Sequence, residues 1–248
     1  TYGFPVEVTT EICEERGYSI DEEEFARCME EQRNRARAAN VKDAEAAWST
    51  YGGVHADLLK ELGATEFVGY ERLSADAKVC AIVRNGERVD SLAAGEQGEI
   101  VLNVTPFYAE MGGEVGDTGT ITADGVELQV IDTKAPEKGL VCHVATVASG
   151  TLAVGMAVSA QVDAKRRACI ARNHTCTHIL HAALRQVLGA HVKQAGSYVG
   201  PDRLRFDFTH FESVTPEQLK QVEELANSVI MSATATNIFE TSLAKARE

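Results

Sequence analysis

Between Thr65 and Val162 the apolar residues recur at every second position, and this period constrains the fold more than any other feature of the sequence. The clearest runs are Val79, Ala81 and Val83; Ile100, Leu102 and Val104; and Val126, Leu128 and Val130. Asn85-Gly86 and Asp124-Gly125 mark turns, and further short strands fit residues 141–147 and 158–162. Alternation is typical of strands with one buried face, and these dipeptides are typical of tight hairpins. The segment therefore predicts a small antiparallel β-barrel.

Helical patterns precede the strands. Residues 1–40 predict two helices, with Asp21 and Glu24 as a capping pair at the start of the second. A shorter helix is predicted over Val54–Leu62, ended by Gly63.

After the strands, Asp163 is expected to cap a long helix that runs to about Leu188. Residues 204–208 alternate like a half-buried strand, and Thr215 opens a second amphipathic helix. We therefore expect an α+β chain in three domains: a short helical segment (1–64), a small antiparallel β-barrel (65–163) and an α/β-layered domain (164–248).

Within the long helix, His174 and His178 lie four residues apart. This spacing places them about 40° apart around the helix and one turn along, so both imidazoles can reach one metal ion. A solvated helix face is the alternative. A zinc metallopeptidase would need a glutamate directly after the first histidine, where this chain has Thr175. Cys176 lies about 160° from the direction between the histidines and is expected to pack behind the helix.

The stretch Thr105–Gly119 holds four glycines within eight residues. Such a run is typical either of tight turns or of a backbone that approaches a phosphate or a neighbouring domain closely. It also carries Phe107 and Tyr108, whose rings are able to stack on a nucleotide base. We expect this stretch to lie against the histidine-bearing domain.

Cysteine use, hydropathy and charge limit where the chain works and what it binds. The six cysteines form no CxxC pair and no apolar run approaches 18 residues, which predicts a cytoplasmic protein with reduced thiols and no membrane partner. The net charge of −13 argues against nucleic acid. However, residues 161–248 carry 11 Lys and Arg against 9 Asp and Glu, so this part is able to approach RNA.

Four motifs in this order resemble the alanyl-tRNA synthetase family. They are Tyr2-Gly3-Phe4-Pro5, Thr105–Gly119, His174-x-x-x-His178, and Leu204-Arg205-Phe206-Asp207-Phe208. The resemblance covers essentially the whole chain. It implies that residues 1–64 end the helical tRNA-recognition region, that the barrel leads into the editing domain, and that residues 164–248 begin this domain.

The resemblance implies a middle fragment of an alanine–tRNA ligase, which binds tRNA(Ala) and contributes to zinc-dependent hydrolysis of mischarged seryl- or glycyl-tRNA(Ala). In the family, Zn²⁺ is held by the two HxxxH histidines, here His174 and His178, with a Cys and a His of a later CxxxH motif. This sequence contains no such motif. ATP and Mg²⁺ belong to an aminoacylation region that lies upstream in the family. We therefore expect this chain neither to activate alanine nor to hydrolyse seryl-tRNA alone, and to hold zinc weakly or not at all.

Thr177 and Gln194 match family positions that line the editing pocket. Thr177 sits beside His178, and a site that hydrogen-bonds a substrate hydroxyl rejects the analogue lacking it by about 10⁴–10⁵. Alternatively, Thr177 bonds back to the carbonyl of Asn173. His181 is common in the family without being a ligand. For the whole chain, the alternative is a non-catalytic tRNA-binding or interdomain scaffold.

Overall fold

The computed structural model describes residues 53–235 without a break, together with residues 13, 16–18, 20–21, 24–25, 27–31, 241 and 245. The chain divides into two compact units, Thr1–Gly53 and Val54–Glu248. In the first unit the Asp21 carboxylate accepts a hydrogen bond from the Glu24 N–H at 2.9 Å, as expected of a helix N-cap. The Tyr2–Pro5 motif and most of the two predicted helices lie outside the described residues. The boundaries at residues 64 and 163 stay a prediction.

The second unit begins with α3 (Val54–Leu62), which matches the helix predicted there. Gly63 ends it in the left-handed conformation, with φ of 75°, and its N–H bonds to the Leu59 carbonyl at 3.0 Å. Glycine suits this position because it has no Cβ to clash in that conformation. Leu58 is fully buried against apolar residues of the barrel strands.

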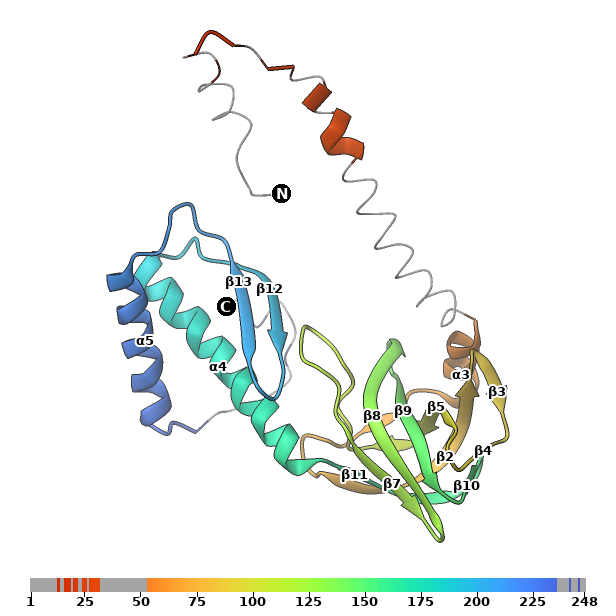
Figure 1. The fold of residues 1–248 in the computed structure, drawn as a ribbon. Coiled ribbons are helices and arrows are strands. Elements are labelled where there is room, and N and C mark those ends of the chain that lie inside the picture. Colours follow the sequence, from red (N-terminus) through yellow and green to blue (C-terminus); the bar gives the residue numbers. More distant parts are fainter. Residues whose placement is uncertain are drawn as a thin grey trace. The chain divides into compact units, whose positions relative to one another are not determined.

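A closed barrel of six antiparallel strands follows (Figure 1). Around the barrel the order is β11 (Ala157–Val162), β7 (Gly119–Ala123), β8 (Val126–Glu137), β9 (Leu140–Ser149), β5 (Gln97–Leu102) and β2 (Ser74–Arg84). Pairing of β11 with β2 closes the ring, which leaves no free edge along these strands. The short strands are β1 (Glu66–Phe67), β3 (Glu87–Val89), β4 (Ser91–Ala93), β6 (Val104–Thr105) and β10 (Thr151–Ala153). The barrel prediction is confirmed.

Both predicted turn dipeptides form hairpins. Asn85 and Gly86 have φ of 53° and 80° between β2 and β3, the pair of positive angles that a type I′ turn requires. Gly125 has φ of 68° between β7 and β8.

The prediction that Val79, Ala81 and Val83 share one face is wrong, because β2 carries a bulge. Its register against β5 shifts between Val79, which pairs with Leu102, and Ala81, which pairs with Val101. Val79 therefore points into the barrel core, whereas Ala81 and Val83 face outward to the apolar cluster that includes Leu58. An extra residue in one strand moves every following side chain to the other face.

β11 passes into α4 (Ala164–Leu188) through one residue, Asp163. The Asp163 side chain accepts from the Arg166 N–H at 3.0 Å, which confirms the predicted N-cap, and the Asp163 N–H bonds to the Thr118 carbonyl at 2.8 Å. Arg166 Nη1 also donates to the Gly116 carbonyl at 2.8 Å. The helix is thus attached to the barrel at its first turn.

α4 packs against β12 (Gln194–Val199), β13 (Leu204–Phe208) and α5 (Pro216–Met231). The shared core holds Ala183, Leu184, Val192 and Val222. Thr215 caps α5 in a reciprocal pair with Gln218, as its sequence predicts. β12 was not predicted, because Gln194 to Val199 contain little apolar alternation.

These elements confirm a mixed α+β fold built on an antiparallel barrel. Within the part of the chain that the structure describes, no helix has the length and apolar character needed to cross a membrane.

Candidate functional site

His174 and His178 lie together on α4, as their spacing predicts. Their rings stack with centroids 5.2 Å apart and planes 21° apart. Both line a cavity of about 660 Å³, whose wall also includes Tyr108, Glu114 and Arg167. Burial, followed by the nearby His174 and His181 rings, lowers the pKa of His178. A lowered pKa favours the neutral imidazole, which is the form that binds a metal.

The glycine-rich stretch lies against the histidine-bearing layer, as expected. The Val199 N–H donates to the Gly113 carbonyl at 2.8 Å, and the Val115 N–H donates to the Val199 carbonyl at 3.1 Å. Gly113 has φ of 90°, and a Cβ placed there would meet the Ser197 carbonyl oxygen at 2.5 Å. Glycine is needed here to let the two backbones approach.

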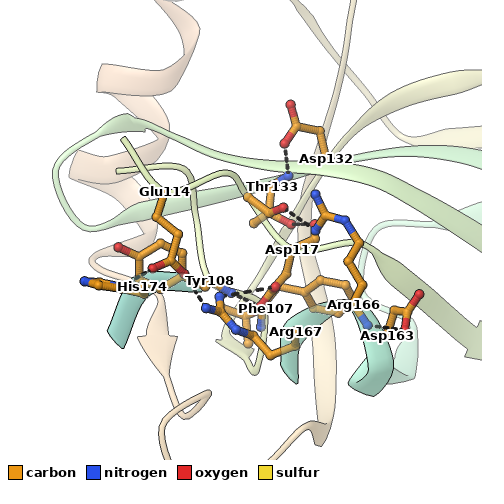
Figure 2. A network of polar contacts seen from close by, with 12 residues as sticks. Phe107, Tyr108, Glu114, Asp117, Asp132, Thr133, Asp163, Arg166, Arg167 and His174 are labelled. Atoms are coloured by element: carbon orange, nitrogen blue, oxygen red, sulfur yellow. Dashed lines mark hydrogen bonds and ion pairs between the residues drawn. The ribbon is translucent and has the colours of Figure 1, made fainter. Parts of the chain in front are cut away.

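Glu114 links this stretch to the histidine helix. Its side chain is 3% exposed, and Figure 2 shows its carboxylate between Arg167 and His174. One carboxylate oxygen pairs with Arg167 Nη2, and the other contacts His174 Nδ1. No local pattern marks Glu114 as a partner of the histidines, because 60 positions separate it from His174.

Asp117 supplies a second carboxylate to Arg167. Its Oδ1 lies 3.4 Å from Arg167 Nη1, and its Oδ2 accepts from the Tyr108 N–H at 3.0 Å. Burial raises the pKa of Asp117, while the Tyr108 N–H and the charge of Arg167 oppose that rise. The Arg167 guanidinium also lies 5.3 Å from the Tyr108 ring centroid, within cation–π range. The cavity wall beside the histidines is therefore charged, aromatic and held by several contacts.

Thr177 lies on the packed face of α4 and is 6% exposed. Its hydroxyl donates to the Asn173 carbonyl at 2.9 Å, which is the alternative that the sequence left open. Asn173 in turn donates to the Gly200 carbonyl at 2.8 Å. Thr177 does not line the histidine cavity.

Gln194 and His181 also lie outside that cavity. Gln194 is exposed at the start of β12. The His181 ring lies 5.0 Å from the Phe206 ring, and its Nε2 lies 3.5 Å from the Val192 carbonyl. The structure thus brings together His174 and His178, but not Thr177 and Gln194 with them.

The structure contradicts the prediction for Phe107 and agrees with the one for Cys176. Phe107 is fully buried in the barrel core, edge-on to the His143 ring at 5.2 Å, so the prediction that its ring is able to stack on a base is wrong. Cys176 lies away from the histidine cavity, as expected, in the wall of another cavity with Val229 and Ile230 of α5.

A group of potential metal ligands that the sequence did not reveal lies between α3 and the barrel. Ligand atoms of His55, Glu99 and Cys142 all lie within 4.8 Å of one another. His55 Nε2 and Glu99 Oε2 are 2.7 Å apart, a hydrogen-bond distance, whereas two ligands of one tetrahedral zinc ion lie roughly 3.4 Å apart. Burial also raises the pKa of Cys142, which favours the thiol over the ligating thiolate. Three separate elements contribute these residues, so no local motif marks them.

Among the described residues, that group is the one set of three or more potential ligands, and it excludes His174 and His178. Even so, the histidine pair fits part of the zinc shell that the family resemblance implies. Two imidazoles line one cavity, and the Glu114 carboxylate contacts Nδ1 of His174, which leaves Nε2 for a metal. Metal-binding histidines commonly donate their second ring N–H to a carboxylate in this way. The donor set fits two positions of a tetrahedral shell.

The family model of the tRNA synthetases of class II (A) matches residues 1–166, which include the barrel and the first residues of α4. The chain is 49% identical to an alanine–tRNA ligase of Carboxydothermus hydrogenoformans and 48% identical to one of Pelotomaculum thermopropionicum, in each case over all 248 residues. It is 48% identical to an alanine–tRNA ligase of Nitrobacter winogradskyi over 231 residues, or 93% of the chain. It spans 28% of the length of the first two relatives and 26% of the third.

Proposed function

The chain belongs to the class II tRNA synthetases, among the alanyl-type enzymes, and on this premise we propose that its histidine-bearing layer takes part in hydrolysing the ester of mischarged seryl- or glycyl-tRNA(Ala). The observation that carries the proposal is the pair His174 and His178 in the wall of one cavity, next to Arg167. The relatives are alanine–tRNA ligases, and we propose that this chain also binds tRNA(Ala).

His174 and His178 would hold the zinc ion, which when bound supplies a Lewis acid for an ester carbonyl. Arg167 lines the same cavity, where Glu114 and Asp117 fix its guanidinium, and its remaining N–H groups are able to donate hydrogen bonds to the substrate. The rings of Tyr70 and Tyr108 line the same cavity and are able to stack on a base.

Thr177 and Gln194 remain proposed contributors to substrate selection. The hydroxyl of Thr177 already has an acceptor in the Asn173 carbonyl, but an oxygen that donates one bond still has lone pairs to accept another. A substrate hydroxyl would need a shift of the packed face around Thr177 to reach it. Gln194 is exposed and needs no such shift.

One observation favours a second candidate, a non-catalytic tRNA-binding or interdomain scaffold. The class II family match ends at residue 166, so it supports a synthetase role for the helical segment and barrel and does not include His174 or His178. A scaffold would hold no stoichiometric zinc.

Two proteins test the proposal: the 248-residue chain, and the same chain extended beyond Glu248 by the corresponding segment of an alanine–tRNA ligase relative. We expect the extended protein to bind one zinc ion and to deacylate seryl-tRNA(Ala), the shorter chain to do neither well, and His174→Ala to abolish both properties in the extended protein. Zinc is measured by elemental analysis and deacylation by release of labelled serine. An extended protein that folds, binds tRNA(Ala), lacks zinc and leaves seryl-tRNA intact would favour the scaffold.

A further inference from the structure

The buried carboxylate of Glu114, in the loop between β6 and β7, contacts the imidazole of His174, a candidate metal ligand. Glu114 is 3% exposed, whereas the His174 side chain is 46% exposed and lines the cavity with His178. The contact joins Glu114 to Nδ1 of His174. Nε2 is therefore the ring nitrogen left for a ligand.

Glu114 has little freedom to leave this position. The residues on either side of it bond to β12: the Gly113 carbonyl accepts from the Val199 N–H, and the Val115 N–H donates to the Val199 carbonyl. The second carboxylate oxygen is paired with Arg167, which Asp117 and the Tyr108 ring hold in turn. The carboxylate is thus positioned by the barrel and its contacts (Figure 2).

The chemistry of this contact depends on which ring nitrogen carries the proton. A carboxylate paired with arginine accepts hydrogen bonds, so His174 meets it by donating from Nδ1–H. The proton on Nδ1 leaves the lone pair of Nε2 available, and a ligating histidine commonly donates its other N–H to a carboxylate. Glu114 shares Arg167 with Asp117, so one oxygen of the Glu114 carboxylate is paired with the guanidinium and the other accepts from the ring.

We propose that Glu114 is a positioning residue, which holds His174 as the Nδ1–H tautomer and directs its Nε2 toward a metal shared with His178. This inference rests on the proposed function, because it assumes a metal at the histidine pair. It adds that the site is assembled from two parts of the fold, the barrel loop and the helix. The orientation exists before any metal arrives.

The test compares two substitutions of nearly equal size that both remove the charge. In Glu114→Gln the amide oxygen can still accept from His174, because Arg167 keeps Asp117 as its other acceptor. In Glu114→Met no acceptor remains. Glu110→Met is the matched control, since Glu110 lies in the same loop and makes an exposed ion pair with Lys134 at 3.0 Å.

The first readout is the tautomer of His174 in the metal-free 248-residue chain at pH 8, from long-range ¹H–¹⁵N ring correlations assigned with His174→Ala. We expect Nδ1–H in the wild type, Glu114→Gln and Glu110→Met, and a shift toward Nε2–H, the form free histidine prefers in water, in Glu114→Met. Nε2–H in the wild type would overturn the inference, as would an unchanged tautomer in Glu114→Met. If that variant fails to fold, the wild-type tautomer still decides.

The second readout is zinc affinity, measured by calorimetry in the chain extended beyond Glu248. Loss of a partner behind a metal-bound histidine typically weakens binding by about 10–100-fold, and we expect this range for Glu114→Met and a change of only a few fold for Glu114→Gln. Equal affinity in all variants overturns the role of Glu114. A wild type that binds no zinc overturns the proposed function instead, and the tautomer measurement remains valid.

Discussion

The burial of His143 makes the stability of the barrel depend on pH. Its ring is fully buried, with Nδ1 at 2.7 Å from the Ile100 carbonyl and Nε2 at 2.7 Å from the Thr105 hydroxyl. The carbonyl can only accept, so the neutral ring donates from Nδ1 and accepts from Thr105 at Nε2. Burial lowers the pKa of His143 from its ordinary 6.5 to about 4, although the Ile100 carbonyl opposes this change.

The sign follows from proton binding. Between pH 6.5 and about 4 the unfolded chain binds a proton at this residue and the folded barrel does not, so stability is full above the unfolded pKa and falls as the pH drops. One pKa unit corresponds to about 1.4 kcal/mol, so the whole difference is worth about 3 kcal/mol. Between pH 7 and pH 5 alone, His143 should remove about 2 kcal/mol from the free energy of unfolding.

His143→Asn tests this pH dependence, because the amide N–H of asparagine can replace Nδ1–H as the donor to the Ile100 carbonyl but cannot be protonated in this range. We expect it to lower the free energy of unfolding at pH 7 by about 1–3 kcal/mol, and to shift the difference from the wild type by about 2 kcal/mol in the variant's favour at pH 5. The measurement is urea unfolding from pH 4.5 to 7.5, followed by circular dichroism. Thr105→Val is the control, because it removes the hydroxyl's bonds to His143 Nε2 and from the Phe107 N–H but leaves the ring buried, so the wild-type slope should persist.

Parallel stability curves for the wild type and His143→Asn would contradict a lowered pKa of His143 in the folded barrel. So would an NMR titration in which the His143 ring of the folded chain takes up its proton near pH 6.5. Either result would mean that water reaches the ring in the native barrel.

Two more predictions concern the loop and the helix beside the candidate site. Gly113→Ala should lower the melting temperature more than Gly112→Ala, since both glycines have positive φ but only at Gly113 would a Cβ meet Ser197. Equal decreases in differential scanning calorimetry would show that the close approach to Ser197 does not contribute to stability. Thr177→Val should lower the free energy of unfolding in urea by about 1 kcal/mol. In the extended protein it should leave zinc in place and weaken discrimination between serine and alanine esters, and unchanged deacylation rates for both esters would remove Thr177 from the pocket.

Local signals in the sequence were sufficient for most of the fold. The Asn85-Gly86 turn, the Asp163 cap and the Thr215 capping pair each depend on backbone groups within a few residues, so their sequences predict them directly. The bulge after Val79 escaped prediction because an extra residue in one strand has meaning only relative to its partner strand.

The site was harder to predict because its decisive contact is tertiary. The spacing of His174 and His178 predicts their common direction, but nothing local marks Glu114 as the residue that meets His174. Phe107 failed for a related reason: an aromatic ring next to glycines suits a stacking surface and a barrel core equally well. Only the closed barrel decides between them.

A single residue joins β11 to α4, so the helix is fixed to the barrel at its first turn. With 1.5 Å of rise per residue, His174 lies roughly 16 Å along α4 from Asp163. A tilt of 5° at Asp163 would move it by about 1.4 Å, more than the roughly 0.5 Å within which a metal site must be held. The contact of Glu114 with His174 attaches the helix to the barrel loop a second time, at the residue whose position matters for a metal. A helix attached to the barrel at two points bends less than one attached at a single point, so the barrel restricts the motion of His174 and His178 and preserves their orientation.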